Sequence, residues 1–248
     1  RPWSLAGLLC LMASAASAQI LNIEKSRLDS LNPEKPYQIK MEANVDFYNR
    51  SATNAEKAKF FSTKGALNAT YAPRKTAYLL IGEISYVENN GISILNNGNL
   101  HFRTTFNRRS KFSTEVYIQG QYDNFRGLTD RVLAGVAERW RVVESKKFDW
   151  HFAAGPMYEY ERWRMPEDDE AFRQKRLPKL SSYMTFRWKI SETVDFNTIA
   201  YYQVGYDREE DLTRNRVSGN TNLNFKITKK LSFHTGISIA YEDEPIVP

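Results

Sequence analysis

From Tyr37 to the end of the chain, apolar and polar residues alternate with a period of two. This alternation is typical of β-strands that have one apolar and one polar face. After residue 36 no segment keeps the period near 3.6 that would indicate an amphipathic helix. The pattern predicts eleven strands, at approximately 37–50, 58–71, 76–88, 98–108, 112–124, 131–144, 148–164, 179–190, 194–207, 215–227 and 231–242.

The segments between these strands alternate in length. The short turns lie at 73–75, 109–111, 145–147, 191–193 and 228–230, and the longer polar segments lie at 51–57, 89–97, 125–130, 165–178 and 208–214. Outer-membrane barrels of bacteria have short periplasmic turns and longer extracellular loops. The expected fold class is therefore all-β, an antiparallel up-and-down transmembrane β-barrel.

The number of strands adds a further expectation. A closed bacterial barrel normally has an even number of strands, so we expect eleven strands present of twelve. The last strand would follow Pro248, and strands 37–50 and 231–242 would be the edges of an incomplete seam.

One face of the predicted strands is uncharged. In strand 98–108 this face carries Leu100, Phe102 and Phe106, whereas the opposite face carries His101 and Arg103. In a membrane barrel the apolar face contacts lipid, and in a soluble barrel it lines the interior, so alternation alone does not decide between them. The loop rhythm, aromatic residues near strand ends and the amino-terminal segment favour the membrane barrel.

Glu138 does not fit this assignment. It lies on the apolar face between Val136 and Trp140, where a charge at the bilayer midplane would be costly. A bulge or a protein contact would be needed to accommodate it.

The chain divides into three parts. Residues 1–18 have a positive flank, a short apolar run and the small-residue site Ala16-Ser17-Ala18, which is typical of a secretory signal peptide. Residues 19–36 form a polar lead-in, and 37–248 form the barrel domain, expected in the cell outer membrane. The single cysteine, Cys10, lies in the signal segment, so the remaining chain has no disulfide framework.

The net charge of +6 comes from 35 basic and 29 acidic residues that are interleaved along the chain. No basic helix or finger motif is present, so nucleic acid is not an expected partner. The expected partners are outer-membrane lipid, including lipopolysaccharide, and the barrel-assembly machinery. The sequence identifies no protein partner and no cofactor motif. The acidic run at 167–170 is interpreted as a solvated loop, with calcium or lipopolysaccharide phosphates as alternative ligands.

Acidic and basic residues are nearly balanced on the face predicted to point inward. We therefore predict a lumen charge network, made by Arg103, Glu115, Arg139, Glu159, Arg187, Asp195 and Lys226. A filled, non-enzymatic barrel of structural or stress-related role is the first interpretation. The alternative is a narrow diffusion channel for small solutes, which requires an open lumen.

No catalytic, cofactor-binding or metal site is predicted. The three histidines, His101, His151 and His234, fall on different strands without a second ligand at metal-binding spacing. Outer-membrane phospholipases need a serine and a histidine on the lipid-facing side, and all three histidines fall on the polar face.

Two segments carry a resemblance to a known family. The stretch from Tyr122 to Gly135 is similar to a central Tyr-Glu and Gly-Leu-x-x-Arg motif, and Tyr241 to Pro245 resembles a late Tyr-Asp-x-x-Pro turn. Both are found in the salt-induced outer membrane protein family, catalogued as domain of unknown function 481. The resemblance covers about 37–248, although 49–54 departs from the family's early Ser-Gly-Asn-Thr segment. It implies an outer-membrane barrel and no known activity, so no functional residues are transferred.

Overall fold

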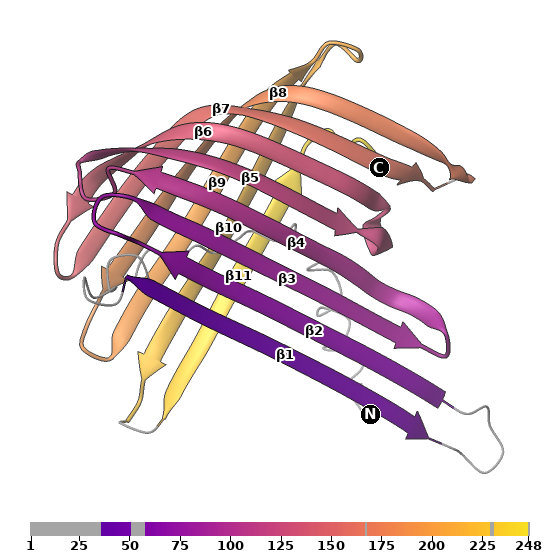
Figure 1. Ribbon diagram of the computed structural model, residues 1–248, viewed down its shortest axis with the longest axis horizontal. Helices are drawn as coiled ribbons and strands as arrows, with labels where there is room; N and C mark the ends of the chain where they lie inside the picture. The colour runs from indigo at the N-terminus through magenta and orange to yellow at the C-terminus, as the bar shows by residue number, and fades with distance from the viewer. Residues whose placement is uncertain (1–35, 51–57, 167, 229–230, 248) are drawn as a thin grey trace, which may run out of the picture.

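A computed structural model describes residues 36–50, 58–166, 168–228 and 231–247 (Figure 1). The described residues form one antiparallel sheet in which each of eleven strands pairs with the next along the chain. The strands are β1 (Tyr37–Arg50), β2 (Ala58–Tyr71), β3 (Ala77–Asn89), β4 (Ile92–Phe106), β5 (Phe112–Asp123), β6 (Leu128–Glu144), β7 (Phe148–Met165), β8 (Asp168–Lys189), β9 (Val194–Asp207), β10 (Leu212–Lys226) and β11 (Ser232–Glu242). The all-β, up-and-down prediction is confirmed. The predicted signal peptide and all but the last residue of the lead-in lie outside the described residues.

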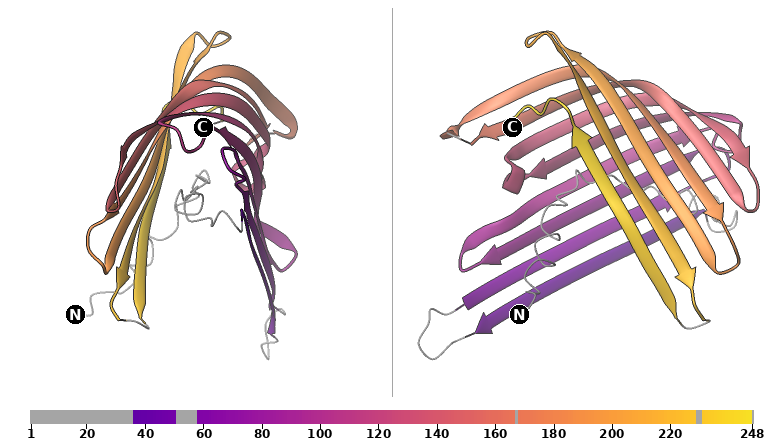
Figure 2. Two further views of the ribbon diagram at one scale, coloured as in Figure 1. Left: turned by 60° about the vertical axis from the view of Figure 1, so that its left-hand side comes forward. Right: turned by 180° about the vertical axis from the view of Figure 1, so that it is seen from behind.

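The sheet is strongly curved. β5 to β8 form its crest, and β1 to β4 and β9 to β11 form two facing walls (Figure 2). β1 and β11 are the two edges, as expected, because no pairing joins them in the part of the chain that the structure describes. The only helical element described is the one-turn 3-10 helix Asn124–Arg126. Among the described residues, no helix has the length and apolar character needed to cross a membrane.

Several predicted loops are in fact parts of strands. The predicted loop 89–97 is wrong, since β3 and β4 are joined only by Asn90 and Gly91. Both have positive φ, 51° and 80°, as a two-residue type I′ turn requires, and Asn-Gly favours that turn. The predicted loop 165–178 is also wrong, because β8 begins at Asp168. Here neither face of the strand is consistently apolar, so alternation of hydrophobicity could not reveal it.

The two faces of the sheet differ in the predicted way. Leu100 on β4 faces outward and is 54% exposed, whereas Arg103 on the concave side of the same strand is 7% exposed. The same division recurs on β6, where Val132 and Val136 are exposed and Leu133 is buried. Large uncharged side chains therefore cover the convex face, and most buried charges lie on the concave side.

Glu138 lies on the convex face without a bulge. Its register with Thr114 on β5 and with Ala154 on β7 is regular, and the shifts in β6 lie elsewhere. The Thr114 hydroxyl donates to Glu138 Oε1 at 2.5 Å. Thr114 is the third residue of β5, beside the stacked rings of Phe112 and Trp140. The charge therefore sits near the end of the sheet, where a membrane would penalise it by only about 0–1 kcal/mol.

Candidate functional site: the charged interior

Six charged side chains from five strands meet on the concave side. We call them the central charge cluster, which consists of Arg131 (β6), Glu159 and Glu161 (β7), Lys179 (β8), Arg216 (β10) and Glu242 (β11). Each points inward because it occupies the inward phase of its strand's alternation. Glu159 and Glu161 are two residues apart on one strand and therefore share a face.

Glu159 is the centre of this cluster. Its Oε1 accepts hydrogen bonds from Arg131 Nε at 2.6 Å and from Arg216 Nη1 at 2.8 Å, and its Oε2 pairs with Lys179 Nζ. Arg216 Nη2 also donates to Glu161 at 2.9 Å and to Glu242 at 2.8 Å. Glu159 is 2% exposed, so these contacts replace its hydration almost completely.

The cluster connects the crest of the sheet to one wall. Arg216 on β10 bonds to Glu159 on β7, although β8 and β9 lie between them in the sheet. Three carboxylates and three cations balance in charge. A balanced set does not create the one-sign field that a charged selectivity ring uses.

A second layer lies beside the cluster and is rich in tyrosine. Arg103 Nη1 pairs with Glu115 at 3.2 Å, and the Tyr183 hydroxyl donates to Glu115 Oε2 at 2.6 Å. The Arg103 guanidinium also lies 5.9 Å from the ring of Tyr117 and 5.4 Å from that of Tyr183. Tyr183 stands against Tyr201 on β9, with ring centroids 5.4 Å apart. We call these five residues the tyrosine layer. A guanidinium over an aromatic face is attracted to the ring, so these contacts hold the Arg103 side chain among the tyrosines.

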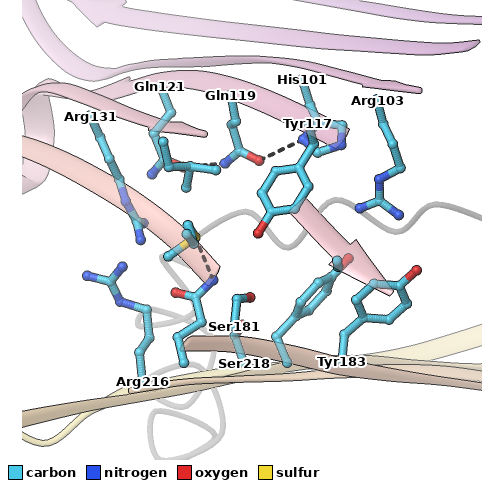
Figure 3. Close-up of a pocket in the computed structure, with 15 residues that line it drawn as sticks. His101, Arg103, Tyr117, Gln119, Gln121, Arg131, Ser181, Tyr183, Arg216 and Ser218 are labelled. Atoms are coloured by element: carbon cyan, nitrogen blue, oxygen red, sulfur yellow. Dashed lines mark hydrogen bonds between the residues drawn. The ribbon is translucent and has the colours of Figure 1, made fainter. Parts of the chain in front are cut away.

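A cavity of about 80 Å³ lies between the central charge cluster and the tyrosine layer. Figure 3 shows His101 and Gln119 on one side and Ser181 and Ser218 on the other. Arg103 and Arg131 also border it. We call it the lumen cavity. It shows that the interior is not completely filled.

Further charges lie at the end of the sheet where β11 terminates and where the turn joins β9 to β10. Lys175 Nζ lies 3.1 Å from Asp207 and 3.0 Å from Glu210, and Arg214 Nη2 lies 3.0 Å from Asp207 and 2.8 Å from Glu210. These four side chains link β8 to the β9–β10 hairpin. We call them the mouth cluster.

Residues 243–247 leave β11 and cross the mouth (Figure 2). Ile246 is 3% exposed and packs with Leu128 and Trp163 of β6 and β7. Arg173 donates to the Ile246 carbonyl at 3.0 Å. We call this segment the strap. It holds the wall that contains β11 against the crest.

Two carboxyls at the mouth have lowered pKa values. The hydrogen bond from Lys175 lowers the pKa of Glu210, which lies in the turn between β9 and β10. The side-chain amide of Asn215 donates to Asp243 in the strap at 2.6 Å, which lowers the pKa of Asp243. Their ionised forms therefore stabilise the folded mouth.

We expect acidification to loosen the mouth before the rest of the sheet. The stabilisation is fully present above the usual carboxyl pKa values, 4.5 for Glu210 and 3.8 for Asp243, and is lost as the pH falls below them. Amide hydrogen exchange at about pH 6 and about pH 3, corrected for intrinsic rates, should show lost protection in 208–211 and 243–247. The Asp243→Asn variant should show less of this pH dependence in the strap. Equal protection at both pH values would contradict the expectation.

The predicted lumen residues fall into four separate groups. Arg103, Glu115 and Arg139 lie together, with Arg139 3.9 Å from Glu115. Glu159 belongs instead to the central charge cluster. The remaining predicted residues form two peripheral pairs, in which Arg187 lies 3.8 Å from Asp149 and Lys226 lies 3.6 Å from Asp195.

Sequence reasoning did not single out Lys179 and Arg216, two of the three cations that bind Glu159. Arg216 lies in the same phase as the polar face assigned to 215–227, so its inward direction could have been read from the alternation. Lys179 is the first residue of the predicted strand 179–190 and has the same phase as Arg187, so its inward direction was readable in the same way. Within the described residues, no group of three or more His, Cys, Asp or Glu side chains could hold a metal ion.

An antiparallel meander with a largely uncharged convex face and a charged concave side defines a protein of the up-and-down β-barrel class. The chain belongs to the DUF481 family, described as proteins of unknown function, whose family model matches residues 40–246. A search of curated proteins gave no match. A search of solved structures gave none either.

Proposed function

We propose that this chain is a non-enzymatic outer-membrane β-barrel protein whose lumen is obstructed, with a structural or salt-stress-related role in the bacterial envelope. One observation carries the proposal, namely that large apolar side chains are exposed outward while charged side chains are buried inward. A water-soluble barrel would have the opposite arrangement. A transmembrane barrel has this one, because its outer surface contacts hydrocarbon.

The convex face supports contact with lipid. Ile118 on β5, Leu180 on β8 and Tyr202 on β9 are 51%, 54% and 45% exposed on this face. At one end of the sheet the Phe112 and Trp140 rings stack with centroids 6.3 Å apart, as in an aromatic girdle. The proposed partners are therefore outer-membrane lipid, including lipopolysaccharide, and the barrel-assembly machinery that inserts such proteins. Co-sedimentation with outer membranes after a high-salt wash tests this location.

The concave side supports an obstructed lumen. The central charge cluster and the tyrosine layer place ion pairs and rings across the space between the crest and the walls. Two of the three histidines, His101 and His151, are buried on the concave side, away from the lipid-facing surface that a phospholipase site would use, and this supports the non-enzymatic part of the proposal.

We expect the full chain to show no steady open current in a planar lipid bilayer. The buried ion pairs hold the inward side chains in place, and their balanced charge offers no path for one ion type. The Tyr183→Ala/Tyr201→Ala variant removes two inward rings and should raise the conductance. The matched control, Tyr202→Ala, removes an outward ring and should not.

Protease protection in vesicles verifies that each variant has inserted. A steady current through the unmodified chain would overturn the obstructed-lumen proposal and favour a narrow diffusion channel for small solutes. If the double variant stays closed, the tyrosine layer does not obstruct the lumen.

A further inference from the structure

We propose that the lumen cavity is a binding site for a small neutral polyol, a compound with three or four carbons that each carry a hydroxyl group. Three residues that line the cavity each have a buried polar atom with no hydrogen-bond partner among the described residues: His101 Nε2, Arg103 Nε and Gln203 Oε1. His101 and Arg103 are 3% and 7% exposed. Buried polar atoms are normally paired, so each of these indicates a group that the cavity accommodates.

Hydrogen bonds fix the role of His101. Gln119 Nε2 donates to Gln121 Oε1 at 2.9 Å, which leaves Gln119 Oε1 as the acceptor that faces His101 Nδ1 at 3.0 Å. Nδ1 therefore carries the proton in the neutral ring, and Nε2 is an acceptor. A ligand must donate a hydrogen bond to Nε2.

The other two atoms complete the pattern. Gln203 Nε2 contacts Met157 Sδ at 3.9 Å, and its amide oxygen is the second acceptor. Arg103 Nε–H is a donor. Two acceptors and one donor, on β4 and β9, match hydroxyl groups, because each hydroxyl both donates and accepts.

The charges at the cavity favour a neutral ligand. Arg131 and Arg216 both bind Glu159, and Arg103 binds Glu115. An anion would have to compete with these carboxylates, and a cation would be repelled by the guanidinium groups. A hydroxyl compound can bind without disturbing any ion pair.

The size and walls of the cavity favour a small polyol. At about 10–15 Å³ for each water position, 80 Å³ holds roughly six water-sized groups. Glycerol and erythritol have six and eight non-hydrogen atoms. Leu133, Ala137 and Met157 line part of the cavity and can contact the C–H surface of such a compound. Figure 3 shows Tyr117 projecting into the same space.

Titration calorimetry on the detergent-solubilised full chain, with glycerol and with erythritol, tests the proposal. We expect saturable binding of at least one of them, and at least tenfold weaker binding in the His101→Phe and Gln203→Leu variants. The matched control is His234→Phe on β11, whose ring faces Asn224 away from the cavity, and it should bind as the unmodified chain does.

Ser218→Leu provides a test that keeps all three polar atoms. Ser218 lines the cavity, so a leucine there fills the space and should abolish binding even if the other variants fail to fold. Absence of saturable heat with both polyols would show that the cavity holds only water. Unchanged binding in Ser218→Leu, or equally tight binding of inorganic phosphate, would also overturn the proposal. None of these outcomes depends on the bilayer conductance.

Discussion

Replacing Glu159 by glutamine is expected to lower the free energy of unfolding by about 3–5 kcal/mol, the typical cost of removing one partner from a buried ion pair. The amide keeps the shape of the side chain but removes the charge that neutralises Arg131, Lys179 and Arg216. These cations would remain buried with too few carboxylates. Denaturant unfolding in detergent micelles, followed by tryptophan fluorescence, measures the change.

The matched control for this variant is Glu144→Gln. Glu144 forms an ion pair with Arg141 at 2.5 Å, but its side chain is 52% exposed. Exposed pairs contribute about 0–1 kcal/mol, so this variant should change stability little. A further variant, Glu159→Gln/Lys179→Met, removes one cation as well and should recover part of the loss. Equal stability of Glu159→Gln and Glu144→Gln would contradict the role assigned to the cluster.

The second large effect is expected at Gly155 on β7. A Cβ atom there would lie 1.9 Å from the Val136 carbonyl oxygen and 2.7 Å from Ala137 Cα on β6. Both are backbone atoms, so relief of the clash requires the two strands to separate. Pro156 follows and has no N–H to donate to β6. Gly155→Ala should therefore destabilise the crest by about 1–3 kcal/mol or more.

Gly120→Ala is the matched control for Gly155→Ala. Gly120 also lies inside a strand, β5, but a Cβ there meets no atom within 4 Å. This variant should leave stability unchanged or raise it slightly, because glycine weakens a strand interior. Unfolding curves of the two variants make the comparison. If Gly155→Ala is as stable as Gly120→Ala, β6 and β7 do not approach as closely as the structure shows.

Alternation was sufficient to predict the strands and their faces wherever one face is apolar. Strand β4 is an example, because Leu100 and Phe102 alternate with His101 and Arg103, and the structure exposes the first pair and buries the second. The same reasoning failed at the start of β8, where neither face is consistently apolar. The turn at Asn90-Gly91 could have been recognised from its residue types, but the prediction placed a longer loop over 89–97.

It was harder to predict from the sequence which residues form each charge cluster. Which charges point inward follows from the phase of each strand, and this identified Glu159 and Arg103 as lumen residues. Which of them meet depends on how the sheet curves, because Glu159 and Arg216 are 57 positions apart and belong to strands that do not pair. No local pattern encodes that curvature. The same limit explains why neither the lumen cavity nor the strap was predicted.

Glu159 on β7 binds partners from the two adjacent strands and from β10, three strands away, and this implies an order of folding. Arg131 and Lys179 belong to β6 and β8, which pair directly with β7, so both become available when local hairpins form. Arg216 arrives only after β9 and β10 have been added. Contacts across longer loops form more slowly, because they require more chain entropy to be lost first. The crest should therefore form early, and docking of the β10–β11 wall onto Glu159 should be a late kinetic step, before which the interior charges remain hydrated.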